Sequence, residues 1–220
     1  MADFERAIIS AVGKVYDQSV MKGCFFHFRQ AIWRSIQKCG LQGPYAADAE
    51  YALNLRMLAA LSFVPEDHVV AAYTELTSSR YYTDNAEEWD GILEYFERTW
   101  VGTLNRRNRR SVPLFPVGLW NHYETTLNHA ERTNNSVEGW HNGFRNRAVV
   151  AHVNTWKFID LLRDCQSDNE IVIEQLLAGR AAANRRRYRD HDQRIFNVVQ
   201  QFDPANILEY LRGVAQNLAF

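Results

Sequence analysis

The fold class of this chain depends on the stretch Val20–Phe28, which reads Val-Met-Lys-Gly-Cys-Phe-Phe-His-Phe. It is a short, apolar and aromatic-rich run after a polar break, and such runs are typical of a buried strand. No other stretch of the sequence favours a strand as clearly. Because a lone strand cannot satisfy its ladder hydrogen bonds, we expect its sheet partners to be missing or to be supplied by something else.

Helical patterns fill most of the chain on either side of this stretch. Gly40 and Gly179 are stop signals, and Pro204 follows the cap Asp203 at the first position of a final helix. Residues 102–117 form the one clear irregular segment. The apolar spacing predicts helices over residues 2–16, 29–39, 48–63, 65–77, 86–100 and 120–127, a helix led by Asn135, a long apolar period from Trp156 to Leu176, and an Arg-rich segment to Phe202. The sequence therefore predicts a mainly α protein with one strand.

The composition is that of a globular intracellular protein. The 220 residues suit one domain, or one domain with appendages, and 46% of them are hydrophobic against 23% charged. The three cysteines, Cys24, Cys39 and Cys165, are odd in number and scattered, which favours a reducing compartment over a disulfide framework. No run approaches the roughly 20 apolar residues of a membrane span, so we expect no membrane partner.

Arginine dominates the basic residues and is clustered in two places. The guanidinium fork matches phosphate oxygens, so the clusters are candidate contacts to a nucleic-acid backbone. A solvated helix face or a nuclear-import signal explains them equally well. The first cluster consists of Arg106, Arg107, Arg109 and Arg110, and the second of Arg185, Arg186, Arg187 and Arg189.

Residues 132–141, which read RTNNSVEGWH, carry the most informative functional pattern. The segment places Glu138 at the start of an expected helix, just after a Pro-rich loop. Glu138 stands three residues after Asn135, the spacing of a capping box, so it also suits a purely local role in its own helix. His141 follows three residues later on the same helical face, where it is expected to orient a carboxylate or to form an ordinary hydrogen bond.

Taken together with segments far upstream, this pattern resembles the Mutator-like-element (MULE) transposases. The resemblance runs in order over about residues 3 to 165, and it rests on four motifs. They are Asp3-Phe4-Glu5, Gly23-Cys24-x-x-His27-Phe28-x-Gln30-Ala31-x-Trp33-Arg34 with Gly40-Leu41, Trp120-Asn121, and Arg132-Thr133-Asn134-Asn135-x-x-Glu138-Gly139-Trp140-His141.

The resemblance implies an RNase H-like core that cuts and joins DNA with an Asp-Asp-Glu site. It assigns Asp3 to the second aspartate and Glu138 to the glutamate, both as catalytic residues and as metal ligands. Its further motif residues are Cys24, His27, Asn134, Asn135 and His141. It divides the chain into a partial core at 1–41, a helical insertion at 42–130, the helix of the glutamate and the next helix at 131–179, and an Arg-rich helical segment at 180–220.

The chemistry implied by the family requires Mg²⁺ or Mn²⁺. Two such ions activate the attacking oxygen and stabilise the leaving oxygen of a phosphodiester, and carboxylates are their preferred ligands. In the family the first aspartate lies on a strand upstream of the second, whereas this chain begins two residues before Asp3. We therefore expect a truncated or domesticated copy that does not hold the metals and does not cut DNA by itself.

Three functional hypotheses follow from the sequence. The first is the C-terminal part of a MULE-type transposase acting in DNA transposition in the nucleus. The second is a non-catalytic protein that binds DNA, or another protein, through its helical part. The third is a small zinc module at Cys24 and His27, whose spacing is legitimate for zinc ligands although residues three apart on a strand face opposite sides. The sequence leaves open whether the chain forms a homo-oligomer.

Overall fold

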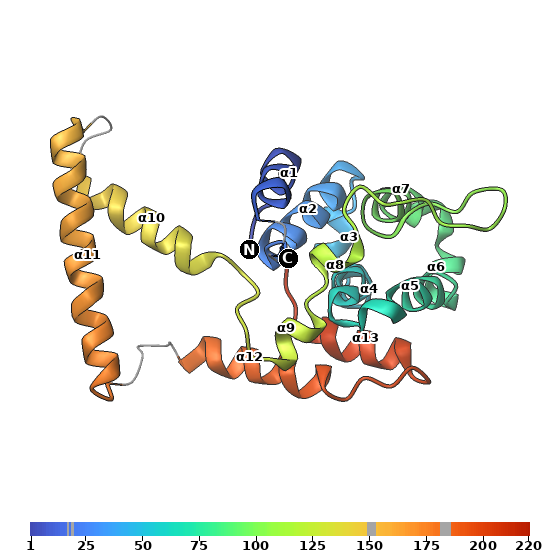
Figure 1. Ribbon diagram of the computed structural model, residues 1–220. Helices are drawn as coiled ribbons and strands as arrows, with labels where there is room; N and C mark the ends of the chain where they lie inside the picture. The colour runs from blue at the N-terminus through green and yellow to red at the C-terminus, as the bar shows by residue number, and fades with distance from the viewer. Residues whose placement is uncertain (17, 19, 149–152, 181–185) are drawn as a thin grey trace. The chain divides into compact units, whose positions relative to one another are not determined.

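A computed structural model gives the structure of the chain (Figure 1). It describes residues 1–16, 18, 20–148, 153–180 and 186–220, with only the backbone described for residues 186–189. The chain divides into two units. Unit 1 consists of Met1–Thr133 and Asp190–Phe220, and unit 2 consists of Asn134–Arg189. The described residues are mainly helical, which confirms the mainly α class.

Unit 1 holds most of the helices. Its elements are α1 (Arg6–Val15), α2 (Phe25–Lys38), α3 (Gln42–Ala47), α4 (Ala49–Ala60), the 3₁₀ turns η1 (Leu61–Phe63) and η2 (Glu66–His68), α5 (Val69–Thr77), α6 (Arg80–Asp84), α7 (Ala86–Phe96), the π-helical turn η3 (Glu97–Val101), α8 (Val117–Trp120), α9 (Tyr123–Leu127), most of α12 (Arg186–Val199) and α13 (Ile207–Gln216). The helices expected at 48–63, 65–77 and 86–100 are confirmed within a few residues.

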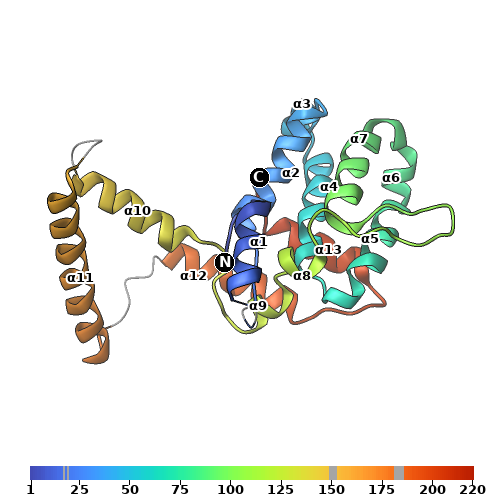
Figure 2. The ribbon, with the colours of Figure 1, turned by 45° about the horizontal axis from the view of Figure 1, so that its top comes forward.

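Helix α4 lies at the centre of unit 1 and is buried on nearly all sides. The Asp48 carboxylate caps its start by accepting hydrogen bonds from the amides of Glu50 and Tyr51 at 2.8 and 3.2 Å. Helix α13 lies along α4, as both ribbon views show (Figure 2). The Tyr210 hydroxyl donates to the carbonyl of Phe63, and the Arg56 guanidinium donates to that of Leu218 at 3.0 Å. The core thus joins segments from both ends of the sequence.

The prediction of a strand at Val20–Phe28 is wrong. Phe25 begins helix α2, and the only sheet-like pairing in this stretch is an isolated parallel bridge between Gly23 and Ala2. The aromatic run becomes helical because Phe25, Phe28 and then Ile32 follow each other at helical spacing, which places all three on the buried face of α2. Because this stretch forms no strand, no sheet partner is needed, and the single bridge to Ala2 only fixes the N-terminal segment beside Gly23.

The last helix also begins later than expected. Asp203 does not cap a helix at Pro204, because its two carboxylate oxygens accept from the amide of Ala205 at 2.9 Å and from the side chain of Asn206 at 2.7 Å. These bonds close a polar turn, and α13 starts only at Ile207.

Unit 2 consists of α10 (Asn135–Ala148) and α11 (Thr155–Leu177), followed by the start of α12. Among its described side chains only Ala148 and Cys165 are buried. The helix expected from Asn135 and the long apolar period ending before Gly179 are confirmed, and Gly179 has the positive φ of a helix stop, 91°. No helix of the described chain is long and apolar enough to cross a membrane.

Candidate functional site

The N-terminal segment is held against the start of α2 by main-chain hydrogen bonds. The amide of Ala2 donates to the carbonyl of Lys22, and the amide of Cys24 donates to that of Ala2, both at 2.9 Å. The amide of Gly23 donates on its other side to the carbonyl of Leu119 at 2.7 Å. These bonds fix the backbone on both sides of Gly23 and place Asp3 beside the first turn of α2.

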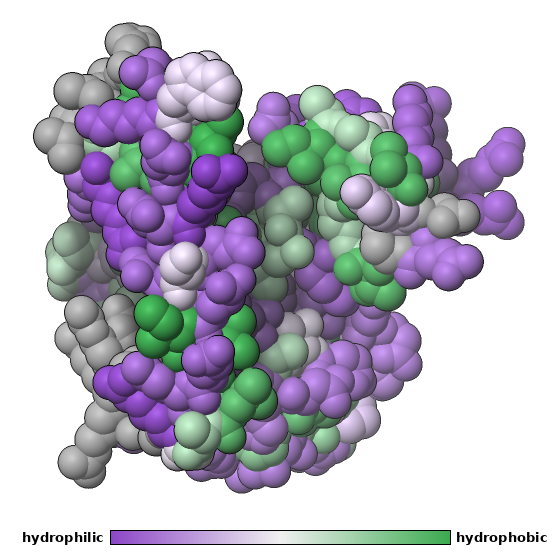
Figure 3. All heavy atoms as spheres, turned by 60° about the vertical axis from the view of Figure 1, so that its left-hand side comes forward, coloured by the Kyte–Doolittle hydropathy of each residue, from purple (hydrophilic) through white to green (hydrophobic). Residues whose placement is uncertain are grey.

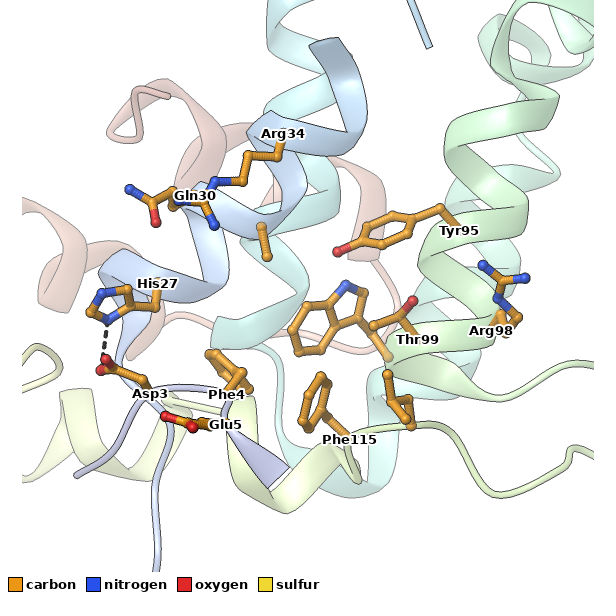
Figure 4. A pocket seen from close by; sticks show the side chains of 13 residues that line it. Asp3, Phe4, Glu5, His27, Gln30, Arg34, Tyr95, Arg98, Thr99 and Phe115 are labelled. Carbon is orange, nitrogen blue, oxygen red and sulfur yellow. Dashed lines mark ion pairs between the residues drawn. The ribbon is translucent and has the colours of Figure 1, made fainter. Parts of the chain in front are cut away.

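Asp3 and His27 meet at this point. Nδ1 of His27 lies 3.0 Å from Oδ1 of Asp3, and the two side chains are 22% and 50% exposed respectively (Figure 4). His27 occupies the third position of α2, so its ring projects from the first turn of the helix, toward Asp3. Cys24 precedes the helix and is fully buried. Two residues from separate sequence motifs are thus in direct contact.

The other two motif segments of unit 1 converge on the same helix start. The amide of Phe25 donates to the carbonyl of Arg132 at 2.8 Å. Trp120 stacks on Phe28 with ring centroids 5.1 Å apart, and its indole nitrogen donates to the carbonyl of Trp100 at 3.1 Å. Four segments spread over residues 2–132 are therefore joined around the first turn of α2.

An open pocket of about 770 Å³ lies beside the Asp3–His27 pair (Figure 4). This volume falls in the range of small-ligand sites, about 300–1,000 Å³. The segment before α1, one face of α2, the end of α7 with η3, and the loop before α8 form its walls. The polar and charged lining residues are Asp3, Glu5, His27, Gln30, Arg34, Tyr95, Arg98 and Thr99.

Aromatic rings form the base of the pocket. Phe4 lies edge-on to Trp100 and to Phe115 at centroid distances of 5.0 and 5.2 Å. The ring of Phe4 also covers Gly23, where an added Cβ would lie 2.6 Å from Cε1 of that ring. Position 23 therefore requires glycine, because any larger residue would push Phe4 away from its aromatic neighbours.

Charge is divided across the pocket. Asp3, Glu5 and His27 lie close together, Arg34 projects from the same helix as His27, and Arg98 lies across the pocket on η3 (Figure 4). Tyr95 also lines the pocket, and burial raises the pKa of its hydroxyl, so the phenol stays protonated at neutral pH. The pocket therefore offers two carboxylates and two separate guanidinium groups to a ligand.

Gln30 and Arg34 belong to the motif that begins at Gly23, but their sequence positions indicate no separate role for them. Tyr95 and Arg98 were not anticipated at all. Their spacing of three puts them on one face of a helix, yet nothing in the sequence indicates that this face lies opposite α2.

A buried histidine lies behind the start of α2. His122 is fully buried, and its ring meets the Phe25 ring edge-on at 5.6 Å. Burial, with the nearby charges of Lys22 and Arg132, lowers the pKa of His122 to about 3. Neither ring nitrogen has a hydrogen-bond partner among the described residues. This histidine is therefore neutral in the folded protein and acts as a packing residue.

The remaining motif residues belong to unit 2. Glu138 lies in the first turn of α10, where its amide donates to the carbonyl of Asn134 at 3.0 Å, and Asn135 is the first residue of the helix. His141 is exposed, and its ring meets Trp140 edge-on at 5.1 Å. Asp3 and Glu138 thus lie in different units, each of which is described by itself.

The first arginine cluster occupies a preformed loop at residues 103–111, here called the arginine loop. An antiparallel bridge joins Leu104 to Arg110, and the Asn105 side chain accepts hydrogen bonds from the amides of Arg107 and Arg109 at 2.9 and 3.1 Å. The side chains of Arg106, Arg107 and Arg109 are exposed.

Arg110 differs from the other three arginines of the loop. It donates to the carboxylate of Glu97 and to the carbonyl of Gly102, both at 2.6 Å, and its guanidinium lies over the Tyr73 ring at 5.5 Å. Because these contacts occupy it, Arg110 anchors the loop, and only three arginines of this cluster face solvent.

The second cluster lies at the edge of what the structure describes. Arg186, Arg187 and Arg189 belong to the first turn of α12, with only their backbone described, and Arg185 lies outside the described residues. Within the described chain, no group of three or more His, Cys, Asp or Glu side chains is placed to hold a metal ion.

Comparisons with protein-family models, with curated proteins and with solved structures find no match to this chain.

Proposed function

We propose that this chain is a DNA-binding part of a MULE-type transposase, whose ancestral reaction is metal-dependent DNA cleavage and strand transfer in the nucleus. One observation carries the proposal. The first three motifs and Arg132, the first residue of the fourth, are far apart in the sequence and meet at the start of α2, with Asp3 against His27. This convergence supports the proposal.

The residues present do not form a complete Mg²⁺ or Mn²⁺ site. Asp3 brings one carboxylate, and His27 already contacts it at 3.0 Å. A divalent ion of this kind needs several oxygen ligands at once, and Glu138, the other ligand that the resemblance implies, belongs to unit 2. We therefore assign no cleavage step to the isolated chain, and propose DNA binding as its activity.

The arginine loop is the surface proposed to hold DNA. Its three exposed guanidinium groups come from a short loop whose backbone is fixed by Asn105 and by the anchor Arg110. A preformed loop loses little conformational entropy on binding, and guanidinium groups pair with phosphate oxygens irrespective of base sequence. The expected partner is the duplex backbone.

Salt dependence of duplex binding tests the proposal. Three phosphate contacts predict a slope of about −2.7 in a plot of log affinity against log salt concentration. Fluorescence anisotropy of a labelled duplex, measured over a salt series with the full chain, gives this slope. The triple variant Arg106→Ala/Arg107→Ala/Arg109→Ala is expected to lose most of it.

A scattered triple variant is the matched control. Arg6, Arg80 and Arg194 are exposed and belong to α1, α6 and α12 rather than to the loop, so replacing all three by alanine removes the same net charge. This control should keep the slope of the parent protein. An equal loss in both variants, or no binding by the parent, would refute the arginine loop as the DNA-binding surface. Nicking of a supercoiled plasmid by the parent with Mg²⁺ would contradict the assignment of binding without cleavage.

A further inference from the structure

Helix α11 presents two adjacent apolar stripes, and α10 covers one of them. The Phe144 ring lies edge-on to Phe158 at 5.7 Å, and the Arg147 guanidinium contacts Sγ of Cys165 at 3.5 Å and the carboxylate of Asp168 at 2.6 Å. The covered stripe therefore runs along the face of α11 that carries residues 158, 165 and 168, which recur at helical spacing.

The neighbouring stripe, here called the open stripe, is largely uncovered by the described residues of unit 2, although Asn169 at its centre borders a small pocket that α10 also lines. Leu162, Ile173 and Leu176 are 38%, 54% and 43% exposed. On the face that Figure 3 turns forward, green hydrophobic residues lie among purple hydrophilic ones. The open stripe consists of Ile159, Leu162, Gln166, Asn169, Ile173 and Leu176. Successive members are three or four residues apart, which is the heptad spacing of a two-helix seam.

The order of residues in the open stripe reads the same chemically from either end. Its outer positions are aliphatic, and its two central positions, Gln166 and Asn169, are amides. If a second α11 lies antiparallel across the first, Ile159 faces Leu176, Leu162 faces Ile173, and each Gln166 faces an Asn169. Every apolar residue then meets an apolar one, and the amides meet amides that both donate and accept hydrogen bonds.

The charges beside the open stripe match in the same register. Arg163 and Glu170 stand at flanking positions on the side away from α10. In the antiparallel arrangement, Arg163 of one copy lies beside Glu170 of its partner, and the two-fold symmetry makes this pair twice. Among the described residues these groups make exposed local contacts, Arg163 to Asp160 at 3.9 Å and Glu170 to Gln166 at 2.9 Å.

From this self-complementarity we infer that the open stripe binds a second copy of this chain, with the two α11 helices antiparallel. Unit 2 buries only Ala148 and Cys165 among its described side chains. Small helical units of this kind are stabilised by association, since an apolar helix face must be covered. The inference does not depend on the proposed DNA binding.

Sedimentation equilibrium of the full chain tests the inference. The parent protein is expected to form dimers at about 100 μM. The variant Ile173→Glu places an unpaired carboxylate opposite Leu162 in both halves of the seam, and should raise the dimer dissociation constant by about 100-fold or more. A parent that stays monomeric at that concentration, for instance because unit 1 of the same chain covers the stripe, would overturn the inference.

Ile171→Glu is the matched control. Ile171 is 53% exposed, against 54% for Ile173, and it points to the opposite side of the same helix. Both variants add one carboxylate to α11 within two residues of each other. Only Ile173→Glu should weaken the dimer, and an equal effect of both would exclude this seam.

A charge exchange tests the antiparallel register. Glu170→Arg alone sets arginine beside arginine twice and is expected to weaken the dimer about fivefold. The double variant Arg163→Glu/Glu170→Arg restores opposite charges only if residue 163 of one copy lies beside residue 170 of the other. Recovery of the parent dissociation constant is the expected result, and a double variant as weak as the single one would refute this register.

Discussion

Unit 1 and unit 2 are both helical, but different interactions hold their helices. Unit 1 buries large aromatic side chains, among them Trp89, Trp100 and Trp120, whereas unit 2 buries only Ala148 and Cys165 among its described side chains. Burial of aromatic surface is a dominant stabilising term. Unit 1 is therefore stabilised by its own core, while the stability of unit 2 depends on what covers its apolar faces.

The largest expected effect comes from truncating an aromatic residue in each unit. Phe28 is fully buried against Trp120 and Trp100, so Phe28→Ala should lower the free energy of unfolding by about 3–5 kcal/mol. Trp156 in unit 2 is 79% exposed, and Trp156→Ala should change the free energy of unfolding by less than about 0.5 kcal/mol. Urea denaturation followed by circular dichroism measures both. Similar losses would erase the distinction between the units.

The next effect is a dependence of the stability of unit 1 on pH. The pKa of His122 is about 3 in the folded protein, against 6.5 for an ordinary histidine. Between these values the unfolded chain binds a proton that the folded chain does not, so stability falls as the pH falls through this window and is unaffected above it. The loss reaches about 3 kcal/mol between pH 6.5 and 4.

Removing the imidazole isolates this contribution. His122→Phe keeps a ring at the position and takes away the titrating group. Urea midpoints at several pH values should show a slope in the parent that is steeper than in the variant by about 1.4 kcal/mol per pH unit. Equal slopes would mean that His122 does not titrate differently in the folded and unfolded chain.

Glycine substitutions should act with opposite sign in the two units. Gly23→Ala forces the Phe4 ring away and should lower the free energy of unfolding by about 2 kcal/mol. Gly139 lies within α10, and an added Cβ there meets nothing within 4 Å, so Gly139→Ala should raise helix stability by about 0.5–1 kcal/mol. Thermal unfolding followed at 222 nm compares the two. A neutral Gly23→Ala would count against the docking of Phe4.

The smallest effect concerns the helix caps. Asp48 accepts from two amides at the start of α4, and Asn154 accepts from the amide of Lys157 at 2.9 Å at the start of α11. Each replacement by alanine should lower the stability of the capped helix by about 1 kcal/mol. Asp48→Ala should raise the rate of amide hydrogen exchange throughout the cooperative core of unit 1. Asn154→Ala should raise it only in the first turns of α11. If Asn154→Ala also raised the exchange rates across unit 1, the two units would have to unfold together.

The helices were accessible from the sequence, since their apolar spacing and stop signals are local. The strand prediction failed because Val20–Phe28 was weighed as a short run by itself. Extended toward Ile32 and Ile36, the same aromatics follow a helical period, and both of these isoleucines are fully buried in α2. A longer window would have favoured the helix.

The candidate site was accessible only in part. Asp3 and His27 were singled out from separate motifs, but their contact depends on the bridge between Ala2 and Gly23, which no local pattern encodes. Tyr95 and Arg98 reach the pocket because α7 packs against α2, and this too is a long-range result of folding. Residue types can be proposed from sequence, whereas their neighbours are fixed by the tertiary structure.

The pairing of α4 with α13 has a consequence for synthesis on the ribosome. The Tyr210 hydroxyl reaches the carbonyl of Phe63, 147 residues earlier in the chain. At translation rates of about 5–20 residues per second, α4 leaves the ribosome roughly 7–30 seconds before its partner helix exists. During this interval the apolar side of α4 is uncovered while unit 2 is being made. The nascent chain is therefore a natural client for chaperones, and slow codons before α13 would prolong its exposure to aggregation.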